Sequence, residues 1–298
     1  MNETRRVEFR CNGRPVSVDS APGESLLSVL RERLGLRSPK DGCAPQGQCG
    51  CCTVLVDGAA RVACVTPVTR VSGRDVTTVE GLDETRRAGL VDAFLATGAS
   101  QCGFCTPGIL MRAAALLDRE GATSTGVDRA LAAHLCRCTG WRTVVEAIGT
   151  TDRTADPTRR LDAATRRAAL EGGVPQRVGP DVPLGSGGFA DDTAPDTALV
   201  AVPLPPGSDA EALDAVGRRW VVAETLIDAR ARAGKVQGRR TSRGDEVPLP
   251  GPACPDGGVS LTTSWVEPAY LEPDASWCEP GQAPASPLAN GGAFGGQS

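Results

Sequence analysis

One short loop rich in glycine carries four of the chain's twelve cysteines: Cys43, Cys49, Cys51 and Cys52. Thiolates at this density repel one another unless a cation lies between them, and glycines let the backbone close around such a group. A further cysteine, Cys64, falls on the next predicted strand. The spacing Cys43-x5-Cys49-x2-Cys52 is one residue longer in its first gap than the plant-type [2Fe–2S] pattern. It fits a [2Fe–2S] loop better than the alternatives, which are a structural zinc site or a set of disulfides.

A second set of cysteines forms two pairs, Cys102-x2-Cys105 and Cys136-x-Cys138, each at the predicted start of a helix. Helix starts offer unpaired N–H groups and the positive end of the helix dipole, which favour an anionic cluster. Zinc could use the same geometry, but a gap of one residue is tight for two ligands of one tetrahedral ion. His134, the chain's only histidine, is interpreted as a helix residue and not as a ligand.

Composition excludes several classes of protein. The net charge is −4 without a run of Lys or Arg, so no nucleic-acid partner is expected. No apolar stretch is long enough to span a bilayer, and the first residues lack the apolar core of a secretory signal. We therefore expect a cytoplasmic protein without a membrane partner, in which cysteines indicate metal or redox chemistry. No zinc-protease helix, nucleophile elbow or phosphate-binding loop is present.

The first 80 residues predict a small mixed sheet packed on one helix, a β-grasp arrangement within an α+β protein. Alternating apolar residues over 6–18, interrupted by Asn12-Gly13, predict a hairpin. Leucines at helical spacing predict a helix over 25–34. Further strands are expected at 53–56, 61–65 and 76–79. Cys11, in the first strand, is expected to be an ordinary buried residue.

Residues 81–155 predict a four-helix domain. The first expected helix ends near Gly98. The second runs from Pro107, with Thr106 as its N-cap, to about Glu120. The third runs from Val127 to Leu135, and the fourth from Trp141, capped by Thr139 or Gly140, to Ile148. Residues 156–180 are predicted to be a linker. Residues 181–298 predict a mixed α/β segment with strands at 198–202 and 259–266 and a helix from Trp220 to Gly234. Cys254 and Cys278 are expected to be ordinary thiols.

The two cysteine sets, in this order, resemble the iron–sulfur subunit of the molybdenum hydroxylases: xanthine dehydrogenases, aldehyde oxidoreductases and aerobic carbon monoxide dehydrogenases. The resemblance covers about residues 4–155 and rests on the motifs at 49–54, 101–108 and 135–141. It implies a plant-type cluster on the first domain and a second cluster on the helical domain. The implied ligands are Cys43, Cys49, Cys52 and Cys64, then Cys102, Cys105, Cys136 and Cys138. Cys51 stands where the family has alanine, which makes it a bystander unless the longer loop lets it replace Cys43.

Four later motifs, at 187–192, 223–236, 270–273 and 291–296, resemble successive landmarks of the family's large, molybdopterin-binding subunit in condensed form. The resemblance implies a fusion: an iron–sulfur subunit followed by an N-terminal portion of the large subunit. We then expect residues 181–298 to fold only against a partner chain, and cleavage near residue 175 to leave both clusters on the N-terminal piece.

The resemblance also implies a function. Electrons would pass from the molybdenum cofactor through both [2Fe–2S] clusters to FAD on another subunit. The partners would be a molybdopterin-binding chain and a FAD-binding chain, in a dimer of heterotrimers. Gln101 and Cys138 would touch the pterin, and the backbone of Phe294 and Gly295 would face molybdenum. No catalytic residue is assigned, because the family's catalytic base lies in later large-subunit sequence. Two alternatives are a stand-alone ferredoxin-like carrier with a disordered tail and a zinc-stabilised interaction module. The substrate stays open.

Overall fold

The computed structural model describes residues 4–43, 46–119, 121, 123–151, 166, 169–170, 179–204, 207, 210–215, 217–234, 258 and 276–285. The predictions for Cys254, for the strand at 259–266, for the motifs at 270–273 and 291–296, and for Phe294 and Gly295 lie outside these residues. None of the helices in the described part of the chain is long and apolar enough to cross a membrane.

The predicted hairpin is present as β1 (Arg5–Cys11) and β2 (Arg14–Ser20). Its two-residue turn has Asn12 at φ 51° and Gly13 at φ 77°, the left-handed conformations that a tight hairpin of this kind requires. Along β1 every second side chain is buried, from Val7 to Cys11, so one face of the ribbon covers a core. Cys11 is a buried residue of this face, as predicted.

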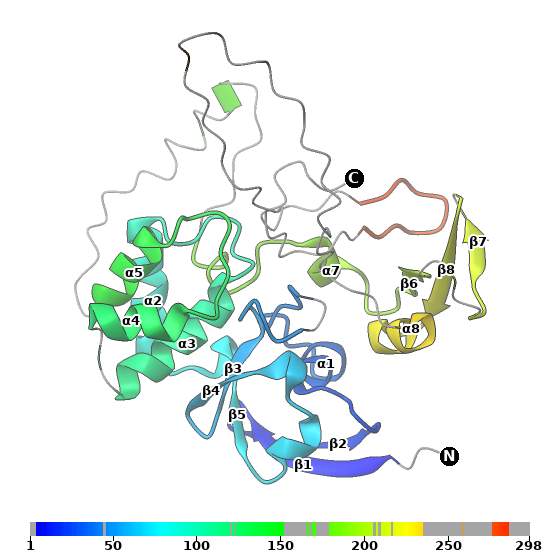
Figure 1. Cartoon of the computed structure of the whole chain (residues 1–298), viewed down its shortest axis with the longest axis horizontal. Coiled ribbons are helices and arrows are strands. Elements are labelled where there is room, and N and C mark those ends of the chain that lie inside the picture. The colour runs from blue at the N-terminus through cyan, green and yellow to red at the C-terminus, as the bar shows by residue number, and fades with distance from the viewer. Residues whose placement is uncertain are drawn as a thin grey trace.

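The first domain is a β-grasp (Figure 1). Its sheet adds β3 (Thr53–Val56), β4 (Ala59–Val62) and β5 (Asp75–Thr77) in the order β2-β1-β5-β3-β4, with β1 and β5 parallel and the other pairs antiparallel. The helix packed on the sheet begins as α1 (Leu26–Ser28), capped by Ser25, and continues as the wide π-helical turn η1 (Val29–Arg33). Short 3-10 turns complete the domain: η2 (Ala63–Val65), η3 (Val68–Val71) and η4 (Val79–Gly81).

The strand predicted at 61–65 is wrong at its end, and the difference concerns Cys64. The strand stops at Val62, and Cys64 lies in η2. The backbone leaves the sheet because the N–H of Ala63 bonds to the Cys52 carbonyl and that of Cys64 points at the Cys52 sulfur. The cysteine loop, and not the sheet, therefore sets the conformation around Cys64.

The four predicted helices of the second domain are present as α2 (Glu84–Thr97), α3 (Thr106–Arg119), α4 (Ser124–Leu131) and α5 (Arg142–Gly149). Asp83 caps α2, which ends at Gly98 in a left-handed conformation. Both ends of α4 and the N-cap of α5 differ from prediction, since α4 begins at Ser124 and not at Val127. The helix expected to reach Leu135 ends at Leu131, so His134 lies beyond it and is not a helix residue. The N-cap position of α5 is Trp141 rather than Thr139 or Gly140.

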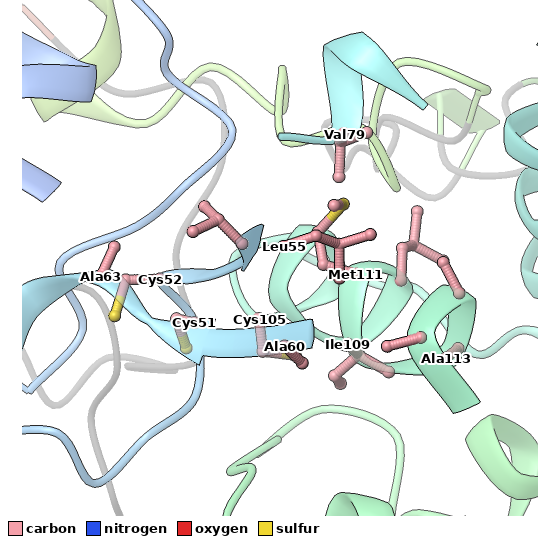
Figure 2. Close-up of a cluster of buried hydrophobic side chains, with 14 of the residues drawn as sticks. Cys51, Cys52, Leu55, Ala60, Ala63, Val79, Cys105, Ile109, Met111 and Ala113 are labelled. Atoms are coloured by element: carbon pink, nitrogen blue, oxygen red, sulfur yellow. The ribbon is translucent and has the colours of Figure 1, made fainter. Parts of the chain in front are cut away.

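One hydrophobic core runs through both domains. It joins Leu30 of η1, Val54 of β3, Phe94 of α2 and Ile109 of α3, all fully buried, and α3 packs directly on β3 and β4. Figure 2 shows Leu55 and Ala60 of the sheet in the same cluster as Ile109 and Met111 of the helix. The two domains are therefore packed as one unit.

The region after residue 180 contributes two separate pieces. Residues 179–196 include α7 (Ala190–Thr193), and Phe189, immediately before this helix, belongs to the core of the first two domains. A small sheet follows in the order β6-β8-β7, formed by β6 (Val200–Pro203), β7 (Leu213–Ala215) and β8 (Arg218–Ala223), with α8 (Leu226–Ala233) against it.

Two expectations for this region differ from the structure. The helix predicted from Trp220 begins only at Leu226, because residues 218–223 form β8 and pair between β6 and β7. The expectation that everything after 181 folds only against a partner is wrong for Phe189 and its neighbours, which pack within this chain. Cleavage near 175 would separate the N-terminal piece from part of its own core.

The shared core predicts a stability effect. We expect Phe94→Ala to lower the free energy of unfolding by about 3–5 kcal/mol, because it leaves a cavity in a fully buried site. Leu213→Ala is the matched control, since that side chain is 62% exposed and its loss should change stability by under about 0.5 kcal/mol. Denaturant unfolding followed by circular dichroism measures both. Equal effects of the two substitutions would contradict the packing described.

Candidate metal centre

The first thiol set gathers where the loop after η1 returns to β3. The four predicted ligands Cys43, Cys49, Cys52 and Cys64 are all buried. Hydrogen bonds from the Cys49 thiol, and then from the Cys64 thiol, lower the pKa of Cys43 well below its ordinary value. The same contact with Cys43 is the main cause that raises the pKa of Cys49 and of Cys64. A negative charge is therefore favoured on the Cys43 sulfur, which accepts hydrogen bonds from the Cys49 and Cys64 thiols.

Backbone N–H groups point at this set, as the glycine content of the loop predicted. The N–H of Gln46 lies 3.2 Å from the Cys43 sulfur, and that of Cys64 lies 3.4 Å from the Cys52 sulfur. Gly47 and Gly50 have φ of 69° and 73°, which lets the loop curl tightly. Hydrogen bonds to sulfur are among the features by which proteins adjust the potential of an iron–sulfur cluster.

The second thiol set consists of two contacting pairs. The Cys102 and Cys138 sulfurs lie 3.3 Å apart, and Cys105 is hydrogen-bonded to Cys136. The bond from Cys105 lowers the pKa of Cys136 to about 6, while the pKa values of Cys102 and Cys105 are raised, each mainly by the bond to its own partner. Each pair combines one cysteine of the Cys102–Cys105 loop with one of the Cys136–Cys138 loop.

The predicted placement at helix starts is present in the structure. α3 begins at Thr106, directly after Cys105, and α5 begins four residues after Cys138. Thr106, predicted as the N-cap, is the first residue of α3, and its hydroxyl lies 3.0 Å from the Ser100 hydroxyl. The N–H of Phe104 lies 3.5 Å from the Cys102 sulfur, so this loop also directs a backbone donor at a thiol.

The donor set fits two binuclear clusters. Among the described residues, no three or more His, Cys, Asp or Glu side chains converge as ligands of one metal ion. What the second set offers instead is two thiol pairs, and a [2Fe–2S] cluster takes two thiolates on each iron. All eight predicted ligands are sulfur, the donor that iron–sulfur clusters use.

Cys51 lies between the two sets. It is fully buried, its thiol donates to the Cys49 carbonyl at 3.8 Å, and its charge would act on both Cys49 and Cys105. Figure 2 shows Cys51 and Cys105 in the same buried cluster. Cys43 contacts both Cys49 and Cys64, so Cys43 stays the predicted ligand and Cys51 the predicted bystander.

The two thiol loops touch through their backbones. The N–H of Leu135, the residue before Cys136, donates to the Cys49 carbonyl at 3.0 Å. A Cβ placed on Gly108, in the first turn of α3, would overlap the Gly50 carbonyl and lie 2.9 Å from the Cys51 Cα. Only glycine allows the backbones of the helix and the loop to come this close. The sequence signal that could have predicted this contact is a glycine in the first turn of a helix.

His134 closes the same junction. Its Nε2 lies 3.3 Å from the Thr53 hydroxyl, and its ring covers Gly50, where a Cβ would meet the imidazole. Burial is the main cause that lowers the pKa of His134 to about 4, so the ring is neutral at pH 7. Sequence reasoning placed this residue on a helix and missed its position between the two loops.

The predicted cofactor contacts are only partly within the described residues. Gln101 is exposed and precedes Cys102, whose sulfur contacts half-buried Cys138. The contacts of Gln101 and Cys138 with a pterin therefore stay a prediction. The exposed Cys278 is free, and it is far from either set in the sequence.

Comparison with known proteins agrees with this geometry. Residues 9–69 match the family described as "2Fe-2S iron-sulfur cluster binding domain", and residues 78–149 match "[2Fe-2S] binding domain". The xanthine dehydrogenase iron-sulfur-binding subunit of Escherichia coli O157:H7 is 40% identical over 151 residues, which are 49% of this chain and 94% of that protein. The nicotine 6-hydroxylase small subunit of Paenarthrobacter nicotinovorans is 42% identical over 143 residues, or 48% and 86%.

A solved structure extends the likeness beyond these residues. The aldehyde oxidoreductase of Desulfovibrio desulfuricans aligns with a TM-score of 0.52 and 29% identity. The alignment covers 67% of this chain and 23% of that one.

The junction predicts the effect of one methyl group. We expect Gly108→Ala to push the two thiol loops apart and to destabilise the unit by about 1–3 kcal/mol, because its Cβ overlaps backbone atoms of Gly50 and Cys51. Gly149→Ala in α5 is the matched control, since nothing lies within 4 Å of its Cβ. Thermal unfolding of both variants measures the difference, and a Gly108→Ala variant as stable as Gly149→Ala would contradict the close approach.

Proposed function

The chain belongs to the iron–sulfur subunit family of the molybdenum hydroxylases, and from this membership we propose the route by which its residues carry electrons. It is an electron-transfer component of such an enzyme, with one [2Fe–2S]-binding domain of the β-grasp type and one of the helical type. In the proposed route, electrons enter from the molybdenum cofactor at the helical domain, pass to the β-grasp domain and leave to FAD on a partner chain.

Eight cysteines would hold the two clusters: Cys43, Cys49, Cys52 and Cys64 in the first domain, and Cys102, Cys105, Cys136 and Cys138 in the second. The bound clusters would supply the one-electron chemistry. The chain's own contribution is to bury or half-bury the thiols, to keep them in contact with one another and to direct the N–H groups of Gln46, Cys64 and Phe104 at sulfur.

The observation that carries the proposal is the hydrogen bond between Leu135 and Cys49. It joins the backbone of one predicted ligand of the first set to the residue before Cys136 of the second set, at 3.0 Å. The close approach of Gly50 and Gly108 lies beside it, and the buried His134 ring covers Gly50. The path from Cys49 to Cys136 therefore runs through covalent bonds of the chain and one hydrogen bond. Such a short connection favours electron transfer between the two thiol sets.

The proposed sites of electron entry and exit follow from which residues beside each thiol set are exposed. Gln101 is exposed and directly precedes Cys102 of the second thiol set, and Cys138, which contacts Cys102, is half-buried. We place the pterin contact at these two residues. Val65 is 56% exposed, follows Cys64 and packs against Gly47. We place the FAD-binding partner at this second surface, because an exposed apolar residue directly follows a ligand of the first thiol set there.

The names of the relatives support partner chains. One is named as an iron-sulfur-binding subunit and the other as a small subunit, so each works within a larger assembly. The structural alignment covers 67% of this chain, more than the 48–49% covered by these relatives, which supports the fusion to an N-terminal portion of the large subunit. A molybdopterin-binding partner carrying the catalytic base, a dimer of heterotrimers and a cytoplasmic location belong to the same proposal.

The ligand assignment predicts opposite results for Cys136, which is half-buried, and Cys51, which is buried. Cys136→Ser should abolish or strongly perturb one of two EPR signals of the reduced protein, because it removes one of the four thiols of the second set. Cys51→Ser should leave both signals, and Cys278→Ser is the exposed control. Loss of a signal in Cys51→Ser together with two intact signals in Cys43→Ser would reverse the assignment in the first loop.

The native assembly provides a second prediction. Purified from its source, the chain should carry about four iron atoms, two for each [2Fe–2S] cluster. It should also come with chains that contain molybdenum and flavin, as metal analysis, flavin fluorescence and gel electrophoresis would measure. A chain that purifies alone and without molybdenum would support the stand-alone carrier. A colourless protein with bound zinc would support the interaction module.

A further inference from the structure

We propose that residues 182–192, which we call the closing segment, act as an internal peptide ligand of the iron–sulfur unit. They occupy a pocket that recognises one aromatic ring followed by two carboxylates, and they cover the Cys102–Cys105 loop. In Figure 1, α7, whose first residues end the closing segment, lies above α1 and to the right of the helical domain. The inference rests on contacts within the chain and does not depend on the proposed electron route.

The two carboxylates meet two buried cations. Arg31 bonds to Asp191 at 2.6 Å and to Asp192 at 2.9 Å, and its side chain is 7% exposed. Lys40, 2% exposed, forms an ion pair with Asp192 and donates to the carbonyls of Arg37 and Gly185 at 2.7 Å. The charges balance, two against two. Because burial lowers the pKa of Lys40 and Asp192 opposes this change, the cation depends on its acidic partner.

The aromatic ring fills the space beside these charges. Phe189 is fully buried and meets Phe104 edge to face, with ring centroids 5.1 Å apart at 84°. The Lys40 ammonium lies 5.3 Å from the Phe189 centroid, within range of a cation–π contact. Phe104 lies between Cys102 and Cys105, so the ring of the closing segment packs directly against the second thiol loop.

Glycines allow the backbones to approach at both ends of the closing segment. A Cβ on Gly103 would overlap the Val182 carbonyl, and one on Gly187 would lie 3.0 Å from the Cys102 carbonyl. A Cβ on Gly185 would lie 2.8 Å from Pro107 and 3.2 Å from the Ser38 Cα. The closing segment therefore touches the second thiol loop and also the stretch that leads into Cys43.

This arrangement makes Asp192 the residue that positions the closing segment. Its loss would leave Lys40 and Arg31 buried with one carboxylate between them, and removing one partner of a buried pair is strongly unfavourable. The outer pair of Arg37 with Asp196, at 3.1 Å, is different because the Asp196 side chain is 93% exposed. The two aspartates thus provide a matched comparison within one short stretch of chain.

The test is hydrogen–deuterium exchange of the full chain, measured by mass spectrometry for the wild type, Asp192→Asn and Asp196→Asn. In the wild type we expect protection of the amides of Asp192, Thr193 and Ala194, which donate within α7. Asp192→Asn should speed exchange over 182–196 on the order of 100-fold. It should also speed exchange around Cys102–Cys105, while the β1–β2 hairpin stays protected. Asp196→Asn should match the wild type.

Two results would overturn the proposal: residues 182–196 exchanging in the wild type as fast as an unstructured peptide, or equal exchange in the two variants. If Asp192→Asn loses hairpin protection as well and so fails to fold, Asp191→Asn decides, because that carboxylate is 37% exposed and its loss is milder. Faster exchange over 182–196 in that variant supports the proposal, and unchanged exchange overturns it. Neither readout requires iron, so a failure of the electron-transfer assignment would be distinguishable.

Discussion

The approach of Gly50 to Gly108 is the contact on which the arrangement of the two thiol sets depends. It lets the first turn of α3 rest on the loop that holds Cys49 and Cys51, and no larger residue fits at Gly108 without overlap. The hydrogen bond from Leu135 to Cys49 and the ring of His134 over Gly50 then fix the second loop from the other side. Two domains with separate sequence signatures thereby place their sulfur atoms on one shared boundary.

The shared core couples the stability of the two domains. Buried residues of the sheet and of α2 and α3 belong to one cluster, so the two domains share a continuous hydrophobic core. A change in the arrangement of the thiols in one domain is therefore expected to disturb the packing of the other domain, even without any effect through the metal. The small sheet near the C-terminal end differs, because its core consists of Val202, Val221, Ala229 and Ala233.

Local signals in the sequence predicted most of the local structure. Asn12-Gly13 specified its hairpin turn, leucine spacing specified the helix under the sheet, and the paired cysteines specified where α3 begins. Prediction failed where distant residues decide. The helix expected up to Leu135 ends early because Leu135 bonds to Cys49 instead, and Arg31 pairs with Asp191 across 160 positions. Residues 220–223, predicted as the start of a helix, belong to β8, because their pairing with β6 and β7 leaves no mark on the local pattern.

The wide turn η1 links the register of one helix to the capture of the closing segment. At Val29–Arg33 the N–H of Leu34 bonds back to Val29, five residues earlier, so this turn holds one residue more than an α-helical turn. Arg31 stands in the middle of it and is buried on the side that meets Asp191. Deletion of a single residue here would restore an ordinary α-helical turn and could still keep Leu26 and Leu30 on the sheet. It would also shift the stretch after this turn, in which Lys40 meets Asp192, relative to Arg31, so that the length of the turn is what keeps both cations on the same carboxylate.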